Sequence, residues 1–189
     1  MDRPSNPLYL RMLVLRCQTG DERALLELVD LYQVRLAYFI GKMLGGSQGA
    51  LRADRVDDLL QDVWLEVLRG LPRLKDASAF PAWVYRIARD RVYREMRGPG
   101  AMQAIDEAEE PVIEVAGEAE FDAEDAALVH ACLDEISPKH REVLVLRFME
   151  DLSYEEMARV IACDVGTVRS RLHYAKEALR KAMEGRNQP

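Results

Sequence analysis

The chain has 189 residues, of which 49% are hydrophobic and 31% are charged, and its net charge is −7. This composition suits one medium or two small globular domains and excludes a disordered or fibrous chain. No apolar run approaches the ~20 residues of a membrane span, and the first residues show no signal-peptide pattern, so we expect a cytoplasmic protein without membrane insertion.

The first part of the chain has the apolar spacing of helices throughout. Repeats of three and four residues predict helices over about 8–17, 21–43, 54–69 and 78–97. Ser78 is a suitable N-cap for the fourth helix. The third helix combines an acidic face with an apolar stripe, made by Leu59, Leu60, Val63, Trp64, Val67 and Leu68.

Charge then divides the chain. No Lys or Arg lies between Gly98 and Pro138, and residues 99–125 hold ten of the 33 acidic residues, which leaves 23 acids against 26 basic residues elsewhere. Proline and glycine also interrupt this stretch. We interpret 98–124 as a flexible acidic linker between a domain at 1–97 and a domain at 125–186, so that the free chain is two tethered modules. A solvated spacer and a mimic of nucleic acid both remain open as roles for the linker.

The last part predicts helices over about 123–136 and 138–149, followed by a helix-turn-helix. Ser153 with Glu156 forms a capping box for a helix that ends near Ile161. After a three-residue turn, Asp164 can cap a final helix that runs to about Glu184. The expected fold is therefore all-α, with two small helical domains.

The final helix carries donors suited to a DNA major groove near its N-terminus. Its buried stripe is expected to be Val168, Leu172, Ala175, Leu179 and Met183. The remaining residues are expected to face outward or to lie at the margin of the stripe, and the candidates are Gly166, Thr167, Arg169, Ser170, Arg171, His173 and Lys176. A solvated amphipathic helix is the alternative.

The fourth helix is strongly basic, with arginines at 86, 89, 91, 94 and 97. Tyr85 and Tyr93 are interleaved with them. Guanidinium groups with exposed rings suit a separated DNA strand, because phosphates pair with arginine and unpaired bases stack on aromatic side chains. Trp83 fits either the core or a DNA contact.

Three cysteines lie too far apart for a disulfide framework. The spacing of His130, Cys132, His140 and Cys163 fits no metal template. Catalytic triads, phosphate loops and HExxH motifs do not occur in the sequence. We therefore expect no metal, no cofactor and no enzymatic activity.

Together these segments resemble the extracytoplasmic-function (ECF) family of RNA polymerase sigma factors. DDLLQDVWLEVLRGLP (57–72) and SAFPAWVYRIARDRVYREMR (78–97) resemble region 2 of that family, and residues 136–183 resemble region 4. The resemblance implies a transcription initiation factor that binds core RNA polymerase and promoter DNA, and an anti-sigma factor as a further partner.

The resemblance also implies roles for individual residues. Region 2 would dock on the clamp helices of the largest polymerase subunit through Asp58, Leu59, Gln61, Asp62 and Trp64. The turn 74–79 would capture a flipped base of the −10 element, and the helix 80–97 would melt that element. The residues assigned to these two tasks are Lys75, Asp76, Ser78, Phe80, Trp83, Tyr85, Arg86, Arg89, Asp90, Tyr93, Arg94 and Arg97. In region 4, the stretch from Val165 to Lys176 would read the −35 element, and the outer surface would meet the flap of the second-largest subunit.

Four positions depart from the family. Pro81 replaces a position that is commonly basic or polar, and Gly98 ends the basic run early. Asp90 stands where the family often has Asn, and Arg94 stands where it often has Asp. We expect Asp90 to pair with Arg86 or Arg94, or else the −10 preference to be unusual. A stand-alone helix-turn-helix regulator and a protein-binding adaptor are the rival interpretations of the whole chain.

Overall fold

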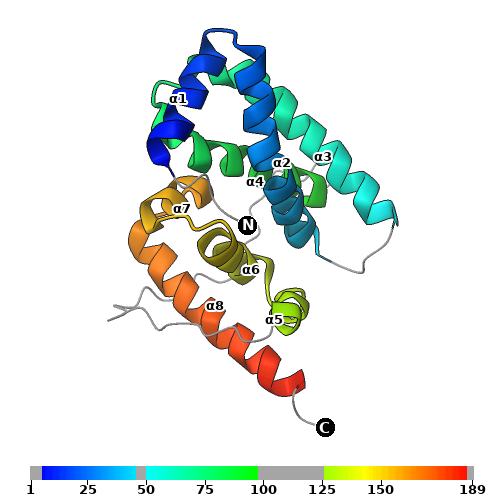
Figure 1. The fold of residues 1–189 in the computed structure, drawn as a ribbon. Helices are drawn as coiled ribbons and strands as arrows, with labels where there is room; N and C mark the ends of the chain where they lie inside the picture. Colours follow the sequence, from blue (N-terminus) through cyan, green and yellow to red (C-terminus); the bar gives the residue numbers. More distant parts are fainter. Residues whose placement is uncertain (1–5, 46–49, 98–125, 187–189) are drawn as a thin grey trace.

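The computed structural model describes residues 6–45, 50–97 and 126–186, and these residues form helices and turns without a strand (Figure 1). They form an all-α protein of two helical domains, as the sequence predicts. The acidic linker predicted at 98–124 lies outside the described residues.

The first domain contains four helices, α1 (Pro7–Gln18), α2 (Glu22–Leu44), α3 (Ala50–Gly70) and α4 (Phe80–Arg97). Side-chain caps fix where α1 and α2 begin: Asn6 accepts from Leu8 N, and Asp21 accepts from the backbone N–H groups of Arg23 and Ala24. Two short 3₁₀ turns, η1 (Leu71–Arg73) and η2 (Ala77–Ala79), join α3 to α4.

The start of α4 differs from the prediction. Ser78 does not cap the helix, because it lies inside η2, and Asp76 caps that turn by accepting from Ser78 N at 2.9 Å. The chain then enters α4 at Phe80, which is fully buried. Its ring packs edge-on against Tyr32, with 5.2 Å between the ring centroids. This aromatic contact anchors α4 to α2.

The second domain contains α5 (Ala126–Leu133), α6 (Pro138–Leu144), α7 (Tyr154–Ile161) and α8 (Val165–Arg186). The capping box at α7 is confirmed: Ser153 Oγ accepts from Glu156 N, and Glu156 Oε2 accepts from Ser153 N at 2.8 Å. Ala162 takes the left-handed conformation, with φ 55°, and turns the chain sharply toward α8. The predicted helix-turn-helix is present.

The predicted helix over 138–149 changes its winding after Leu144. Residues Val145–Met149 form a π turn, η3, in which Glu150 N donates to Val145 O at 3.0 Å. The backbone of Glu150 is thus bonded five residues back instead of four. Asp151 follows with φ 51°, so the chain reverses immediately after Glu150.

The two domains lie against each other. Helix α4 packs against α7, and α2 packs against α6 (Figure 1). One hydrophobic cluster runs through both domains. The expectation of two separate modules in the free chain is therefore wrong for this structure, because residues on α4 and α2 contact the second domain directly.

Candidate nucleic-acid interface

The charged and aromatic side chains of α4 form rows that face different neighbours, because residues four apart share one side of a helix. One row, Tyr85, Arg89 and Tyr93, faces the second domain. We call it the covered row. The next row around the helix is exposed and contains Arg86, Asp90, Arg94 and Arg97. We call it the exposed row.

The exposed row presents three arginines to solvent on the side of α4 that the second domain leaves open. Asp90 pairs with neither Arg86 nor Arg94, which corrects the expectation from sequence. Its Oδ1 lies instead 3.5 Å from Arg89 Nη1. The exposed row keeps a net positive charge, which is what a surface for a phosphate backbone requires.

The covered row is held by one carboxylate of the second domain, Glu142. Arg89 Nε donates to Glu142 Oε1 at 2.8 Å, and the Tyr93 hydroxyl donates to Glu142 Oε2 at 3.2 Å. The guanidinium of Arg89 also lies 4.6 Å from the centre of the Tyr93 ring. The side chain of Glu142 is fully buried. Tyr93 is therefore not an exposed stacking ring, and sequence reasoning missed its acidic partner.

A second carboxylate, Glu150, meets the other end of the covered row. Arg35 of α2 donates to Glu150 Oε2 through Nε at 2.9 Å and to the Glu150 carbonyl through Nη2 at 3.2 Å. The Tyr85 hydroxyl also donates to Glu150 Oε2. Arg35 and Tyr85 are both buried, so the expectation of an exposed Tyr85 is wrong as well. Each buried charge has an opposite charge beside it.

Burial shifts the pKa values of the acidic and phenolic groups in this contact. It raises the pKa of the Glu142 carboxyl, while the charges of Arg89 and Arg171 act in the opposite direction. Burial also raises the pKa of Tyr85 and of Tyr93, which keeps both phenols protonated and able to donate. Hydrogen bonds from Tyr93 and Arg89 stabilise the charged form of Glu142.

Other polar bonds join α2 to the second domain. Lys42 Nζ donates to the His130 carbonyl at 2.8 Å and lies 3.2 Å from Asp134 Oδ2. The Tyr38 hydroxyl is 2.6 Å from His130 Nδ1. Arg141 bridges the helix ends, since its Nη1 donates to the Lys42 carbonyl at 2.8 Å. The contact between the domains is thus rich in charged groups.

The turn before α4 presents Lys75, Asp76 and Ser78 to solvent. Hydrogen bonds from Ser78 N and Oγ lower the pKa of the Asp76 carboxyl. Sequence reasoning missed Gln18 of α1, whose Nε2 donates to the carbonyls of Leu71 and Leu74 at 2.9 and 2.8 Å. Gln18 therefore positions the segment that leads into the turn.

Of the two other aromatic residues predicted to meet DNA, only one retains an exposed part. Phe80 is fully buried in the core. Trp83 is half-buried and covers Gly70, where an added Cβ would lie only 2.6 Å from the Trp83 ring. The ring of Trp83 lies 6.0 Å from that of Phe80. Trp83 thus packs on the first domain and keeps one part of its surface open.

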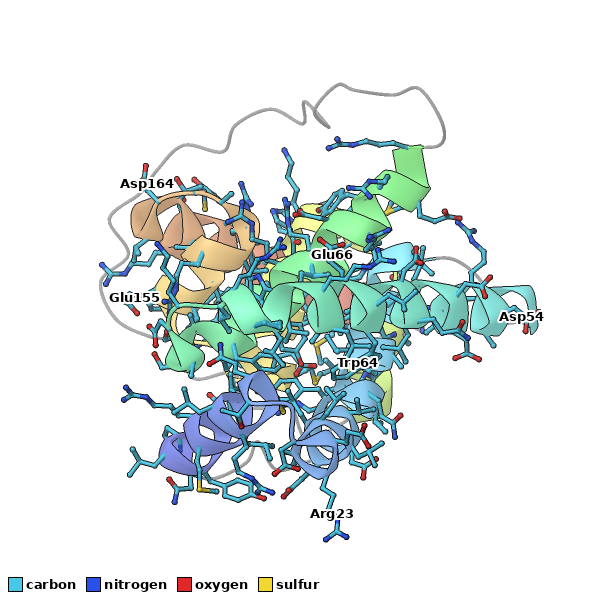
Figure 2. All side chains as sticks on the ribbon, turned by 90° about the horizontal axis from the view of Figure 1, so that it is seen from above. Arg23, Asp54, Trp64, Glu66, Glu155 and Asp164 are labelled. Atoms are coloured by element: carbon cyan, nitrogen blue, oxygen red, sulfur yellow. The ribbon has the colours of Figure 1, made fainter. Side chains whose placement is uncertain are left out.

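The outer side of α3 combines acidic and apolar side chains. Asp58, Gln61 and Asp62 are exposed, whereas Leu59 is buried. Trp64 lies on the side of α3 that faces α2, and its buried Nε1 has no hydrogen-bond partner (Figure 2). Leu68, expected in the buried stripe, is 46% exposed, and Leu65 beside it is 48% exposed. These leucines enlarge the candidate docking surface.

Helix α8 buries Val168, Leu172, Ala175 and Leu179 of its predicted stripe, whereas Met183 is only partly buried against the core. The expectation that Ser170 faces outward to DNA is wrong, because its side chain is 1% exposed and its hydroxyl donates to the carbonyls of Gly166 and Thr167. The other candidate side chains of this helix are at least partly accessible, namely Val165, Thr167, Arg169, Arg171, His173 and Lys176. Gly166 is also exposed.

Two cationic side chains of α8 lie over aromatic rings of the second domain. The Arg169 guanidinium lies 5.6 Å from the centre of the Tyr154 ring, and Lys176 Nζ lies 5.4 Å from that of Phe148. In the parts of the chain that the structure describes, no cluster of His, Cys, Asp or Glu is placed to hold a metal ion. The helices of these parts are all too short or too polar to cross a membrane.

Comparison with known proteins gives the family. The model for sigma-70 region 2 matches residues 28–101, and the model for sigma-70 region 4 matches residues 126–179. The RNA polymerase sigma-H factor of Pseudomonas aeruginosa is 34% identical over 92% of this chain and 93% of its own. This chain belongs to the ECF family of RNA polymerase sigma factors. Sigma factors are transcription initiation factors that bind core RNA polymerase and promoter DNA, and they are not enzymes.

Further relatives agree with this assignment. The ECF sigma-E factor of Escherichia coli is 29% identical over 93% of this sigma factor and 94% of its own chain. The solved structure of CnrH in complex with the cytosolic domain of CnrY has a TM-score of 0.65 at 21% identity, and covers 93% of this chain and 97% of CnrH. The structure of the sigma factor RpoE in complex with the anti-sigma factor NepR from Bartonella quintana has a TM-score of 0.60 at 23% identity. The match covers 84% of this chain and 95% of the matched chain. These structures share the fold.

Proposed function

We propose that this sigma factor works in the cytoplasm by directing core RNA polymerase to promoters with separate −35 and −10 elements, and that it melts the −10 element. One observation carries the proposal: two cationic helix surfaces, on α4 and α8, lie in separate domains joined by a long segment. Core polymerase would fix the spacing of the two surfaces. Tethering would raise the effective concentration of the second domain once the first has bound.

In this proposal, α8 reads the −35 element. Thr167, Arg169 and His173 lie near the start of α8, where a recognition helix contacts base edges and phosphates. Arg171 and Lys176 extend the cationic surface further along the helix. Gly166 leaves the backbone open to a phosphate, and helix N-termini favour anions.

The melted −10 strand would follow the exposed row of α4. Its three arginines suit the phosphates of a separated strand, and the open part of Trp83 suits an unpaired base. The turn with Lys75, Asp76 and Ser78 would hold a flipped base, whose extraction costs a few kcal/mol that contacts in the turn must offset.

The acidic and apolar side of α3 would dock on the clamp helices of the largest subunit. Asp58 and Asp62 suit a basic partner, and the exposed Leu65 and Leu68 add apolar area that a docked helix would bury. Region 4 would contact the flap of the second-largest subunit. The RpoE structure, solved with the anti-sigma factor NepR, supports an anti-sigma factor as a regulator of this chain also.

Run-off transcription with purified core polymerase and promoter fragments from the source genome tests the proposal. We expect specific transcripts only when the sigma factor is added. Asp58→Arg should weaken binding to core in a pull-down, whereas Asp54→Arg, an exposed acid at the far end of α3 (Figure 2), should not. If the chain never directs initiation and binds operators alone, it is a stand-alone regulator instead.

A further inference from the structure

Gln18, the last residue of α1, holds the segment that joins α3 to α4. Its Nε2 donates to the Leu71 carbonyl at 2.9 Å and to the Leu74 carbonyl at 2.8 Å, which lie 53 and 56 residues further along the chain. A side-chain amide nitrogen has two N–H donors, and here each has a backbone oxygen as its partner. Both bonds are partly buried, which limits competition from water.

The backbone after these bonds is extended. Leu74 has φ −69° and ψ 107°, and Asp76 has φ −118° and ψ 105°. The other hydrogen bonds of this part are local, from Leu74 N to the Leu71 carbonyl at 3.1 Å and from Ser78 N to Asp76 Oδ1 at 2.9 Å. Local bonds fix the shape of a turn, but they do not fix its place on the domain. The place depends on contacts with other helices.

Helix α1 supplies such contacts at both ends of the segment. It packs against both η1 and η2 (Figure 1). Leu71 in η1 and Ala77 in η2 are buried, so each 3₁₀ turn has an apolar anchor. The charge of Arg11 on α1 also lowers the pKa of the Asp76 carboxyl, after the stronger effect of the hydrogen bonds from Ser78. The exposed residues between the two anchors therefore project from a frame that α1 completes.

Those exposed residues include Lys75, Asp76 and Ser78, which would hold a flipped base in the proposed function. Telling one base from another requires donors and acceptors at fixed positions, and a misplacement of about 1 Å is enough to lose a productive geometry. The Leu74 carbonyl that Gln18 binds lies directly before Lys75. The model for sigma-70 region 2 begins at residue 28, so α1 and Gln18 lie outside the part of the chain that it matches.

We propose that Gln18 is a positioning residue for the −10 element, and that its amide fixes the turn before α4 so that the turn accepts one base in preference to the other three. Gln18 acts through the carbonyls of Leu71 and Leu74 and does not contact DNA. The inference rests on the proposed capture of a base by this turn. It adds that α1 determines how selective the capture is.

The test uses run-off transcription with purified core polymerase, the full-length sigma factor and one promoter that the wild type uses. Each position of the −10 element carries each of the four bases in turn, and the ratio of transcript yields between bases is the readout. Gln18→Met removes both donors and keeps a side chain of similar length. Gln33→Met is the matched control, because Gln33 is exposed on α2. Asp76→Ala, in the turn itself, identifies the captured position.

We expect Gln18→Met to reduce the base preference at the captured position by at least about fivefold. Preferences at the other −10 positions and at the −35 element should stay within about twofold of the wild type, and Gln33→Met should match the wild type throughout. A loss of folded protein lowers all yields by the same factor and leaves their ratios unchanged. The ratio therefore separates a positioning role from a purely structural one.

The outcomes divide as follows between the inference and the proposed function. A change of base preference in Asp76→Ala but not in Gln18→Met overturns the inference and leaves base capture by the turn standing. No change in either variant overturns both. An equal change in Gln33→Met also overturns the inference, because the effect would then not depend on the amide of Gln18.

A Gln18→Met chain that loses its helical circular dichroism is replaced by Gln18→Asn. The amide of asparagine is one methylene closer to the backbone and cannot bridge both carbonyls, although the residue stays polar. We expect the base preference at the captured position to fall in this variant also. A folded Gln18→Asn chain with wild-type preferences overturns the inference.

Discussion

Arg91 of α4 donates two hydrogen bonds to Glu66 of α3, from Nε at 3.0 Å and from Nη2 at 2.7 Å. Its Nη1 also reaches Asp62 Oδ2 at 3.2 Å. Arg91 therefore joins two helices of the first domain, although by sequence it belongs to the basic surface of α4. Glu66 lies on the side of α3 that faces α4 (Figure 2).

Because Arg91 is engaged with α3, we expect Arg91→Ala to lower the free energy of unfolding by roughly 0.5–1 kcal/mol, which urea denaturation measures. Binding to single-stranded DNA should change little. Arg94→Ala, in the exposed row, should weaken DNA binding and leave the free energy of unfolding unchanged. Equal losses of DNA binding in both variants would contradict the assignment of rows on α4.

Ser170 and Arg169 are neighbours on α8 with opposite surroundings. Ser170 is buried and bonded to its own helix, so Ser170→Ala should leave binding to −35 duplex DNA unchanged. Arg169→Ala should weaken that binding by roughly tenfold, about 1.4 kcal/mol. Anisotropy titrations with region 4 in the context of the full chain check both values, and a large effect at Ser170 would mean that the helix turns when it binds.

Gly45 ends α2 with φ 63° and ψ −173°, a conformation that is nearly restricted to glycine. An added Cβ would also lie 2.8 Å from Arg141 Nη1. We expect Gly45→Ala to cost about 2–3 kcal/mol of stability. Gly41→Ala is the control: it lies within α2 with ordinary contacts at 3.8 Å, and should be neutral or stabilising by about 0.5–1 kcal/mol.

Tyr38 links stability to alkaline pH. Burial first, and then the charges of Asp134 and Glu150, raise its pKa to about 12, against an ordinary value of 10.0. The folded state thus keeps a proton that the unfolded chain releases, so stability falls as the pH rises from 10 to about 12. Absorbance titration at alkaline pH, with Tyr38→Phe as the reference, should give this midpoint. A midpoint near 10 would show that Tyr38 is exposed in solution.

Local signals predicted most of the fold. The start of α2, the capping box at Ser153 and the apolar spacing of α8 depend on neighbours within a few residues, and each lies where the sequence predicts it. Ser78 failed as a cap because Asp76, two residues earlier, takes that role in a 3₁₀ turn. Leu68 failed as a core residue because the buried side of α3 is narrower than its apolar stripe.

The covered row could not be predicted from the sequence. A row such as Tyr85, Arg89 and Tyr93 has the same spacing whether it faces water, DNA or another domain. Its partner Glu142 lies 49 residues from Tyr93, beyond the acidic linker. The sequence held one signal for this contact: Glu142 directly precedes the apolar run 143–146. A carboxylate beside such a run is rarely buried without a partner, so its position indicates a cation or hydrogen-bond donor nearby.

The π turn Val145–Met149 adds one residue to a helical turn, which rotates everything after it by about 100° relative to a regular helix. Glu150 points at Arg35 only because of this extra residue. Deleting one residue from the turn would direct the carboxylate elsewhere and tilt α7 away from α4. The length of this short segment therefore sets the angle at which the two halves of the molecule meet.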